Sequence, residues 1–180
     1  MIVSNADVRH DDLLLAIDAL HASKTIEAVI ETVRVSARAL AEADGIAIIR
    51  RMGDEVHYVA EDAVGPLWAG HAFPIETCIS GLAILERKPI VIANVMLDAR
   101  VPHHLYQDTF VRSMAMFPFG IGSPVGAVGA YWAKPGAIDP DTLAVLEMLT
   151  RSIGAMLYNL DDIHEARRQR ATLRSAWGAA

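Results

Sequence analysis

Amphipathic helices at both ends of the chain, with short β-type runs between them, constrain the fold more than any other feature. Apolar residues recur at helical spacing over residues 13–20 and again over residues 26–40. Thr25 is the expected N-cap of the second of these helices. A long helix near the other end is expected to have Asp139 as its N-cap and Pro140 at its first helical position. The helices are therefore gathered at the two ends of the sequence.

The β-type runs between the helices pair through tight turns. Residues 44–51 and 55–62 flank the turn Met52-Gly53-Asp54, and residues 111–119 and 123–133 flank the sequence "GIGS". A short helix in "CISGLAILER" and a strand in "KPIVIANV" lie between the two hairpins. This order predicts an α+β domain with an antiparallel sheet and helices on one face. The other face must then be covered by residues 63–109, an arrangement that tends to create a cavity.

Composition excludes several classes of function. The 180 residues, 53% of them hydrophobic, suit one domain, with a core at about 13–160. A net charge of −6 argues against nucleic-acid binding. No apolar run approaches the roughly 20 residues that span a bilayer, and the N-terminus is too polar for a signal peptide, so no membrane role and a cytoplasmic location are expected. A single cysteine cannot form an intramolecular disulfide.

Four segments together resemble a GAF domain, a small sensory and regulatory module of bacterial signalling proteins that is often linked to sensor histidine kinases. They are "ADGIAIIRR", "CISGLAILERKPIVIANVMLDAR", "VRSMAMFPF" and "SPVGAVGAYWA". The resemblance covers about residues 13–160. It implies a GAF-like (profilin-like) central antiparallel sheet, with terminal helices on one face and a ligand pocket on the other, under the central helix and loops.

The resemblance implies a small-molecule ligand without naming it, since related domains hold cyclic nucleotides, bilins, haem, anions or amino-acid derivatives. The ligand and any cofactor are therefore unknown. Bilin relatives carry a Cys-His pair where this chain has Pro102-His103-His104, so covalent attachment there is not expected. A histidine of this pair could ligate haem, but a solvated loop is the preferred interpretation, and no metal site is predicted. The residues expected around the pocket are Cys78, Ser80, Asp98, Arg100, Tyr106, Phe110, Arg112, Ser113, Ala130 and Tyr131.

Two pairs of residues near the expected pocket have alternative interpretations. Arg100 and Arg112 bracket a loop and could supply positive charge to an anionic ligand, or each could pair with a nearby aspartate at the surface. Gly126 and Gly129 could leave room for a ligand against the sheet, or they could accommodate close approach of another backbone.

Cys78 raises the question of an enzyme. Free methionine sulfoxide reductases are similar to isolated GAF domains, but they need a resolving cysteine, and this chain has no second thiol. Cys78 lies near an expected helix start, which can activate a thiol, but its apolar neighbours favour a wall of the pocket. The chain is therefore predicted not to be an enzyme. A thiol-dependent redox sensor or reductase that uses an external thiol is the alternative.

The C-terminal helix extends past the core, and residues 161–180 form the expected helical extension. Such a helix cannot bury its apolar stripe alone, so a homodimer through the terminal helices is predicted. It could also be the linker to an output domain such as a kinase. The expected function is a sensory domain that transmits ligand occupancy through these helices, with movement of the loop 98–109 as the hypothetical first step. A structural dimerisation module without a ligand is the third interpretation.

Overall fold

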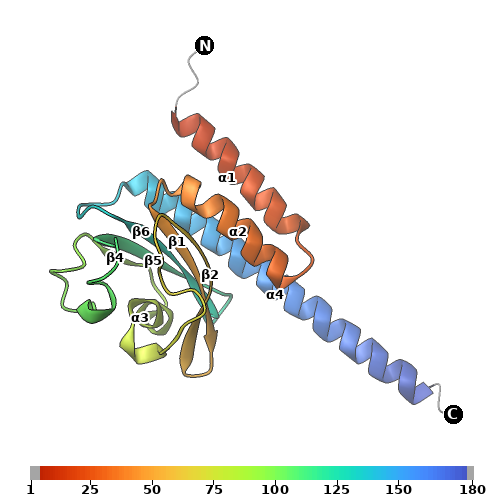
Figure 1. The fold of residues 1–180 in the computed structure, drawn as a ribbon. Coiled ribbons are helices and arrows are strands. Elements are labelled where there is room, and N and C mark those ends of the chain that lie inside the picture. The colour runs from red at the N-terminus through yellow and green to blue at the C-terminus, as the bar shows by residue number, and fades with distance from the viewer. Residues whose placement is uncertain (1–4, 178–180) are drawn as a thin grey trace.

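An antiparallel sheet forms the middle of the domain in the computed structural model, which describes residues 5–177 and the side chains of residues 9–161 (Figure 1). Within this range the strand order is β3-β2-β1-β6-β5-β4. The strands are β1 Gly45–Met52, β2 Glu55–Ala63, β3 Ala72–Pro74, β4 Ile90–Ile92, β5 Ser113–Phe119 and β6 Gly126–Trp132. The two hairpins predicted from the sequence are β1–β2 and β5–β6. The α+β prediction is confirmed.

Three long helices cover one face of the sheet (Figure 1). They are α1 Asn5–Ala22, α2 Ile26–Leu40 and α4 Pro140–Trp177. α2 contacts β1 and β2, α4 contacts β5, and α1 packs against α2 and α4. The predicted cap of α4 is confirmed, because the carboxylate of Asp139 accepts a hydrogen bond from the Thr142 N–H at 3.1 Å.

Thr25 caps α2 as predicted, since its hydroxyl oxygen accepts a hydrogen bond from the Ala28 N–H at 3.2 Å. The substitution Thr25→Ala is expected to lower the free energy of unfolding by about 1 kcal/mol, because this N–H loses its partner. Equilibrium urea denaturation measures the difference. Thr25→Ser keeps the hydroxyl and is the matched control. Equal losses in the two variants would contradict the role of the cap.

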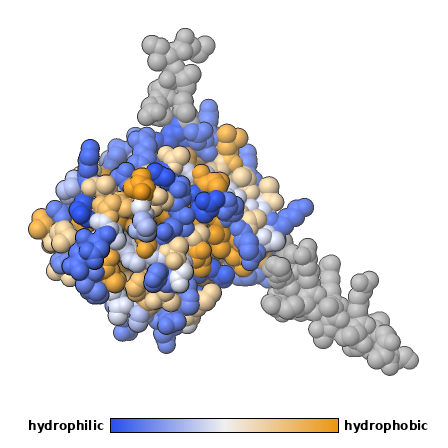
Figure 2. Space-filling view, viewed as in Figure 1, coloured by the Kyte–Doolittle hydropathy of each residue, from blue (hydrophilic) through white to orange (hydrophobic). Residues whose placement is uncertain are grey.

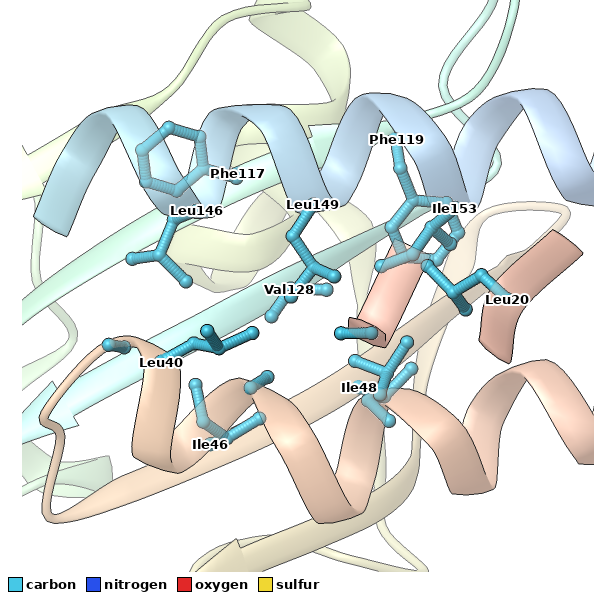
Figure 3. Close-up of a cluster of buried hydrophobic side chains, with 14 of the residues drawn as sticks. Leu20, Leu40, Ile46, Ile48, Phe117, Phe119, Val128, Leu146, Leu149 and Ile153 are labelled. Carbon is cyan, nitrogen blue, oxygen red and sulfur yellow. The ribbon is translucent and has the colours of Figure 1, made fainter. Parts of the chain in front are cut away.

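Side chains of the central strands alternate between two separate cores, as the two-residue period of a strand requires. The first core lies between the sheet and the terminal helices (Figure 3) and includes Leu20, Leu40, Ile46, Ile48, Phe117, Phe119, Val128, Leu146, Leu149 and Ile153. The chain neighbours of these strand residues point to the opposite face, among them Ala47, Ile49, Met116, Ala127 and Tyr131. A shift of one of these strands therefore changes the packing on both faces.

The central part of the chain covers the second face, as predicted for residues 63–109. It contributes the 3-10 turn η1 Ile75–Thr77, helix α3 Ile79–Glu86, strand β4 and the 3-10 turn η2 His103–Leu105. The sequence interpretation missed β3, which pairs with the β2 strand at Val56 and Phe73. β3 has three residues, ends in proline and follows a glycine- and proline-rich stretch, so it carries no period that could identify it.

α4 continues as a helix to Trp177, and its last turns extend away from the sheet and from α1 and α2 (Figure 1). Side chains beyond residue 161 lie outside the described part of the chain, so the role of the predicted extension 161–180 as a linker stays a prediction. Among the described residues, no helix combines the length and the apolar character that crossing a bilayer requires.

Candidate functional site

The second core lies between the sheet and α3, where the sequence predicted a pocket. It is built from β1, β2, β5 and β6 on one side and from η1, α3 and the loop 93–111 on the other. Cys78, Ile79 and Ile84 face the sheet from the α3 side and are all buried. Among the described residues, no Asp, Glu, Lys, Arg or His is buried in the domain. The second core is therefore uncharged.

Four aromatic rings meet in this core, and Trp68 contacts the other three. Its ring centroid lies 5.5 Å from that of Tyr58, 4.9 Å from that of Tyr106 and 5.7 Å from that of Tyr131, each in an edge-to-face arrangement. This geometry is the preferred one for aromatic pairs. Trp68 therefore lies between three tyrosine rings, and Phe73 packs on the outside of Tyr58 with a centroid distance of 5.6 Å.

Polar groups form a short chain inside the cluster. The Cys78 thiol lies 3.3 Å from the Ser80 hydroxyl, which lies 3.1 Å from the hydroxyl of Tyr58. The Tyr106 hydroxyl donates a weak bond to the Met114 sulfur at 3.9 Å. The Tyr131 hydroxyl is buried and has no hydrogen-bond partner. The Tyr58 hydroxyl is its nearest polar neighbour by effect, since the interaction of the two hydroxyls contributes to the pKa of both tyrosines.

Burial raises the pKa of all three tyrosine hydroxyls above the ordinary value, and the proximity of the Cys78 sulfur adds to the effect. For Tyr58, the interactions with the hydroxyls of Ser80 and Tyr131 oppose the rise in pKa without cancelling it. The three phenols are therefore neutral over the physiological pH range. The cluster offers neutral hydrogen-bonding groups, a combination suited to an uncharged ligand.

Glycine at position 129 makes room for a side chain of the protein itself. A Cβ atom placed there would lie 2.4 Å from the Tyr131 hydroxyl oxygen and 2.9 Å from the terminal methyl of Met116. At Gly126 a Cβ would lie 2.3 Å from the carbonyl oxygen of Ile49. Close approach of another backbone is therefore the interpretation that the structure supports at Gly126, whereas at Gly129 the space is taken by the side chains of Tyr131 and Met116.

The structure brings four of the ten predicted site residues together in the second core: Cys78, Ser80, Tyr106 and Tyr131. The half-buried Phe110 packs at the edge of this core. Two residues lie elsewhere, which corrects their predicted placement. Ala130 packs in the first core on the helix side, and the Ser113 hydroxyl donates to the carbonyl of Lys134 at 2.8 Å.

The charged members of the predicted set are engaged within the protein near its surface. Arg100 forms a two-pronged ion pair with Asp98 at 2.9 and 2.6 Å, and these hydrogen bonds lower the pKa of Asp98. Pairing with an aspartate is therefore confirmed for Arg100. Arg112 differs, because its guanidinium donates to the carbonyls of Thr109 and Val111, each at 2.8 Å. Neither cation faces the aromatic cluster as a free charge.

Sequence reasoning missed Tyr58 and Trp68. Tyr58 lies on β2 two residues after Val56, so the two-residue period of a strand could have placed it on the buried face. Trp68 is a large aromatic residue in a stretch rich in glycine and proline, where a loop side chain of this size usually needs a place to be buried. Neither signal reveals that the two rings meet.

Three surface pockets are described, and residues of the second core line none of them. One lies between α1 and the start of α4, one beside the connection from β6 to α4, and one at the C-terminal end of α2. The side chains of the second core are mostly buried against one another.

Comparisons with known proteins agree with this architecture. The family model described as "GAF domain" matches residues 23–157. No curated protein sequence matches the chain significantly. Among solved structures, the free methionine-R-sulfoxide reductase from Neisseria meningitidis in complex with its substrate has a TM-score of 0.77 at 13% identity, covering 91% of this chain and 96% of that one.

Two further structures are similar. The GAF domain of a phosphoenolpyruvate-protein phosphotransferase from Coxiella burnetii has a TM-score of 0.75 at 18% identity, with coverage of 93% and 99% of the two chains. The chromophore-binding domain of a bacteriophytochrome from R. palustris has a TM-score of 0.74 at 12% identity, with coverage of 89% and 64%. At these identities the similarity establishes the fold alone.

Proposed function

This chain belongs to the GAF domain family, and we propose that it is a non-enzymatic sensory domain that binds a small molecule in the second core. The Tyr131 hydroxyl carries the proposal, because it is fully buried without a hydrogen-bond partner. Such a group costs roughly 1–3 kcal/mol of stability, and a polar ligand group that reached it would remove that cost. Two similar structures, a chromophore-binding domain and a reductase in complex with its substrate, are consistent with ligand binding on this fold.

The sheet offers a physical route from the ligand to the terminal helices. Tyr131 faces the second core, whereas its neighbour Ala130 packs against the helices on the other face. α4 contacts β5, which pairs with β6 along its length. A ligand that contacts Tyr131 would therefore act on β6 and change how α4 packs against the sheet. A binding site is coupled to an output when the output element, here α4, packs differently in the ligand-bound and ligand-free states.

The proposal includes a homodimer formed through the terminal helices. α1 exposes Leu14 and Leu15 by 59% and 66%, and α4 exposes Met148 and Tyr158. Figure 2 shows apolar side chains between polar ones on the side of the domain where these helices lie. Packing against a second copy would bury them. An output domain joined after α4, such as a histidine kinase, would then receive the change in helix packing.

Native mass spectrometry of the freshly purified chain, with an absorbance spectrum of the same sample, tests the proposal. The expected result is a dimer with a bound small-molecule mass that disappears under denaturing conditions. A bare protein that also shows no thermal shift with aromatic compounds, nucleotides or anions would overturn the proposal. The structural dimerisation module would then be the better interpretation.

Thiol redox chemistry at Cys78 is the second candidate function. One observation favours it: the thiol is at the N-cap position of α3 and lies 3.3 Å from the Ser80 hydroxyl. Two observations count against it. Cys78 is only 6% exposed, and the chain has no second cysteine to trap an oxidised sulfur as an intramolecular disulfide.

Alkylation of Cys78 by iodoacetamide is expected to be at least about a hundredfold slower in the folded protein than in denaturant, because the reagent must wait for local opening. Mass spectrometry of timed samples measures the two rates. The Cys78→Ser variant is expected to keep any bound mass seen in the wild type. Fast labelling of the folded protein, with a peroxide response that Cys78→Ser abolishes, would favour the redox alternative.

A further inference from the structure

The loop between β2 and β3, residues 64–71, carries Trp68 into the second core. The end of this loop bonds Tyr58 of β2 through the backbone, with the Gly70 N–H donating at 2.8 Å and the His71 carbonyl accepting at 3.0 Å.

One carboxylate bonds the residues on either side of Trp68. Glu61 of β2 accepts hydrogen bonds from the N–H of Leu67 at 3.1 Å and from the N–H of Ala69 at 2.8 Å. These two donors flank Trp68 in the chain. Glu61 therefore fixes the backbone on both sides of the residue that bears the indole ring.

Trp68 differs from the other three rings of the cluster in its support. Tyr58 and Tyr131 belong to strands of the sheet, and Tyr106 directly follows η2. Trp68 belongs to no helix or strand. The indole is 8% exposed, so it already lies at the boundary between the cluster and solvent. Of the four rings, it can leave the core with the least disruption of regular structure.

We propose that Trp68 occupies the ligand position in the unliganded protein, and that the ligand is a small, uncharged aromatic molecule that displaces it. The ligand would lie between the rings of Tyr58, Tyr106 and Tyr131 and would present one hydrogen-bonding group to the Tyr131 hydroxyl. Glu61 is the latch that keeps Trp68 in place until the ligand competes with it. This inference rests on the proposed function and adds the chemistry of the ligand and the element that moves.

The chemistry follows from what surrounds the indole. Three tyrosine rings meet its edges and faces, and an aromatic ligand would keep those contacts. A charged ligand would lose its hydration, and no described charged side chain is buried there to replace it. Arg100 and Arg112 are not available to neutralise an anionic ligand, because Arg100 is paired with Asp98 and Arg112 bonds backbone carbonyls.

The latch predicts how affinity responds to mutation. If Trp68 must leave the core before the ligand can bind, only the fraction of molecules with Trp68 displaced is competent to bind. The apparent dissociation constant is then the intrinsic one divided by that fraction. Glu61→Ala removes the two hydrogen bonds, so displacing Trp68 costs less and the affinity for indole is expected to rise about tenfold. The effect is no larger because water replaces part of what the bonds contribute. Glu61→Gln keeps one acceptor and should lie in between. Glu55→Ala removes a carboxylate of the same strand that bonds His57 instead, and it should match the wild type.

Fluorine NMR of the full chain labelled with 5-fluorotryptophan tests the proposal. The chain has three tryptophans, and the single variants Trp132→Phe and Trp177→Phe assign their signals. Indole is the probe, and indole-3-carboxylate is its charged counterpart. We expect indole to move the Trp68 signal toward that of an exposed tryptophan in the wild type, and at about tenfold lower concentration in Glu61→Ala. The Trp132 signal, whose indole N–H bonds the Glu42 carbonyl at 3.0 Å, should stay in place.

Two results would overturn the proposal. One is a Trp68 signal that neither indole nor phenol moves in Glu61→Ala up to their solubility limits. The other is stronger binding of indole-3-carboxylate than of indole. If native mass spectrometry nevertheless finds a bound molecule, the proposed sensory function stands and only this inference fails. If it finds none, and no aromatic compound, nucleotide or anion shifts the thermal unfolding of the protein, both are wrong.

Discussion

Replacing Gly81 with alanine is expected to lower the free energy of unfolding by about 3 kcal/mol. A Cβ atom on residue 81 would lie 1.7 Å from the carbonyl oxygen of Ile75 and 2.5 Å from its carbonyl carbon. Both are backbone atoms, so no side-chain rotation can relieve the overlap. The start of α3 would have to move away from η1, and α3 would then no longer close the second core.

Chemical denaturation of the wild type and of Gly81→Ala measures this effect, with an unchanged m-value as the check that the same amount of surface unfolds. Gly65→Ala is the matched control, because its added Cβ would meet its nearest atom at an ordinary 3.6 Å, a carbon of the Phe110 ring. This control should differ from the wild type by less than about 0.5 kcal/mol. A Gly81→Ala protein as stable as the control would show that α3 does not approach η1 so closely.

The order and type of the long elements could be predicted from the sequence because they depend on local rules. Helical spacing identified the terminal helices, and the polar residues Thr25 and Asp139 marked where α2 and α4 begin. Glycine-containing turns identified both hairpins. β3 could not be predicted in this way, since it is held by its partner strand and has no pattern of its own.

The assignment of residues to a face shows where sequence reasoning could have gone further. Ala130 and Tyr131 were both expected around the pocket, yet consecutive residues of a strand point to opposite faces. The period alone could have excluded one of them. Ser113 follows the same rule, because it alternates with Met114, which faces the second core. The face of each residue was therefore available from the sequence once the strands were placed.

The contacts that shape the candidate site depend on distance in the chain, and no local pattern reveals them. Glu61 bonds a loop six to eight residues away, and Trp68 meets Tyr106 and Tyr131 from far along the sequence. The role of Arg112 is equally hidden, because its guanidinium bonds carbonyls of its own loop rather than an aspartate. Only the folded arrangement brings these groups together.

Replacing Tyr131 with phenylalanine is expected to stabilise the unliganded protein by about 1 kcal/mol while weakening its binding of indole about fivefold. The substitution removes a buried hydroxyl that has no partner and leaves the ring in place. In the complex the same hydroxyl would accept a hydrogen bond from the indole N–H, so its removal would lose a hydrogen bond only in the complex. Thermal unfolding measures the first effect, and the fluorine spectra of the tryptophans measure the second.

Tyr58→Phe provides the opposite control on the same face. The Tyr58 hydroxyl lies 3.1 Å from the Ser80 hydroxyl, so its loss should lower the free energy of unfolding by about 1 kcal/mol. If the two substitutions change the free energy of unfolding in opposite directions, the Tyr131 hydroxyl destabilises the protein without ligand, whereas the Tyr58 hydroxyl stabilises it. A purely structural second core gains nothing from the Tyr131 hydroxyl, whereas a ligand site does. If Tyr131→Phe instead destabilises the protein and leaves indole binding unchanged, the hydroxyl has a partner within the protein and is no mark of a ligand.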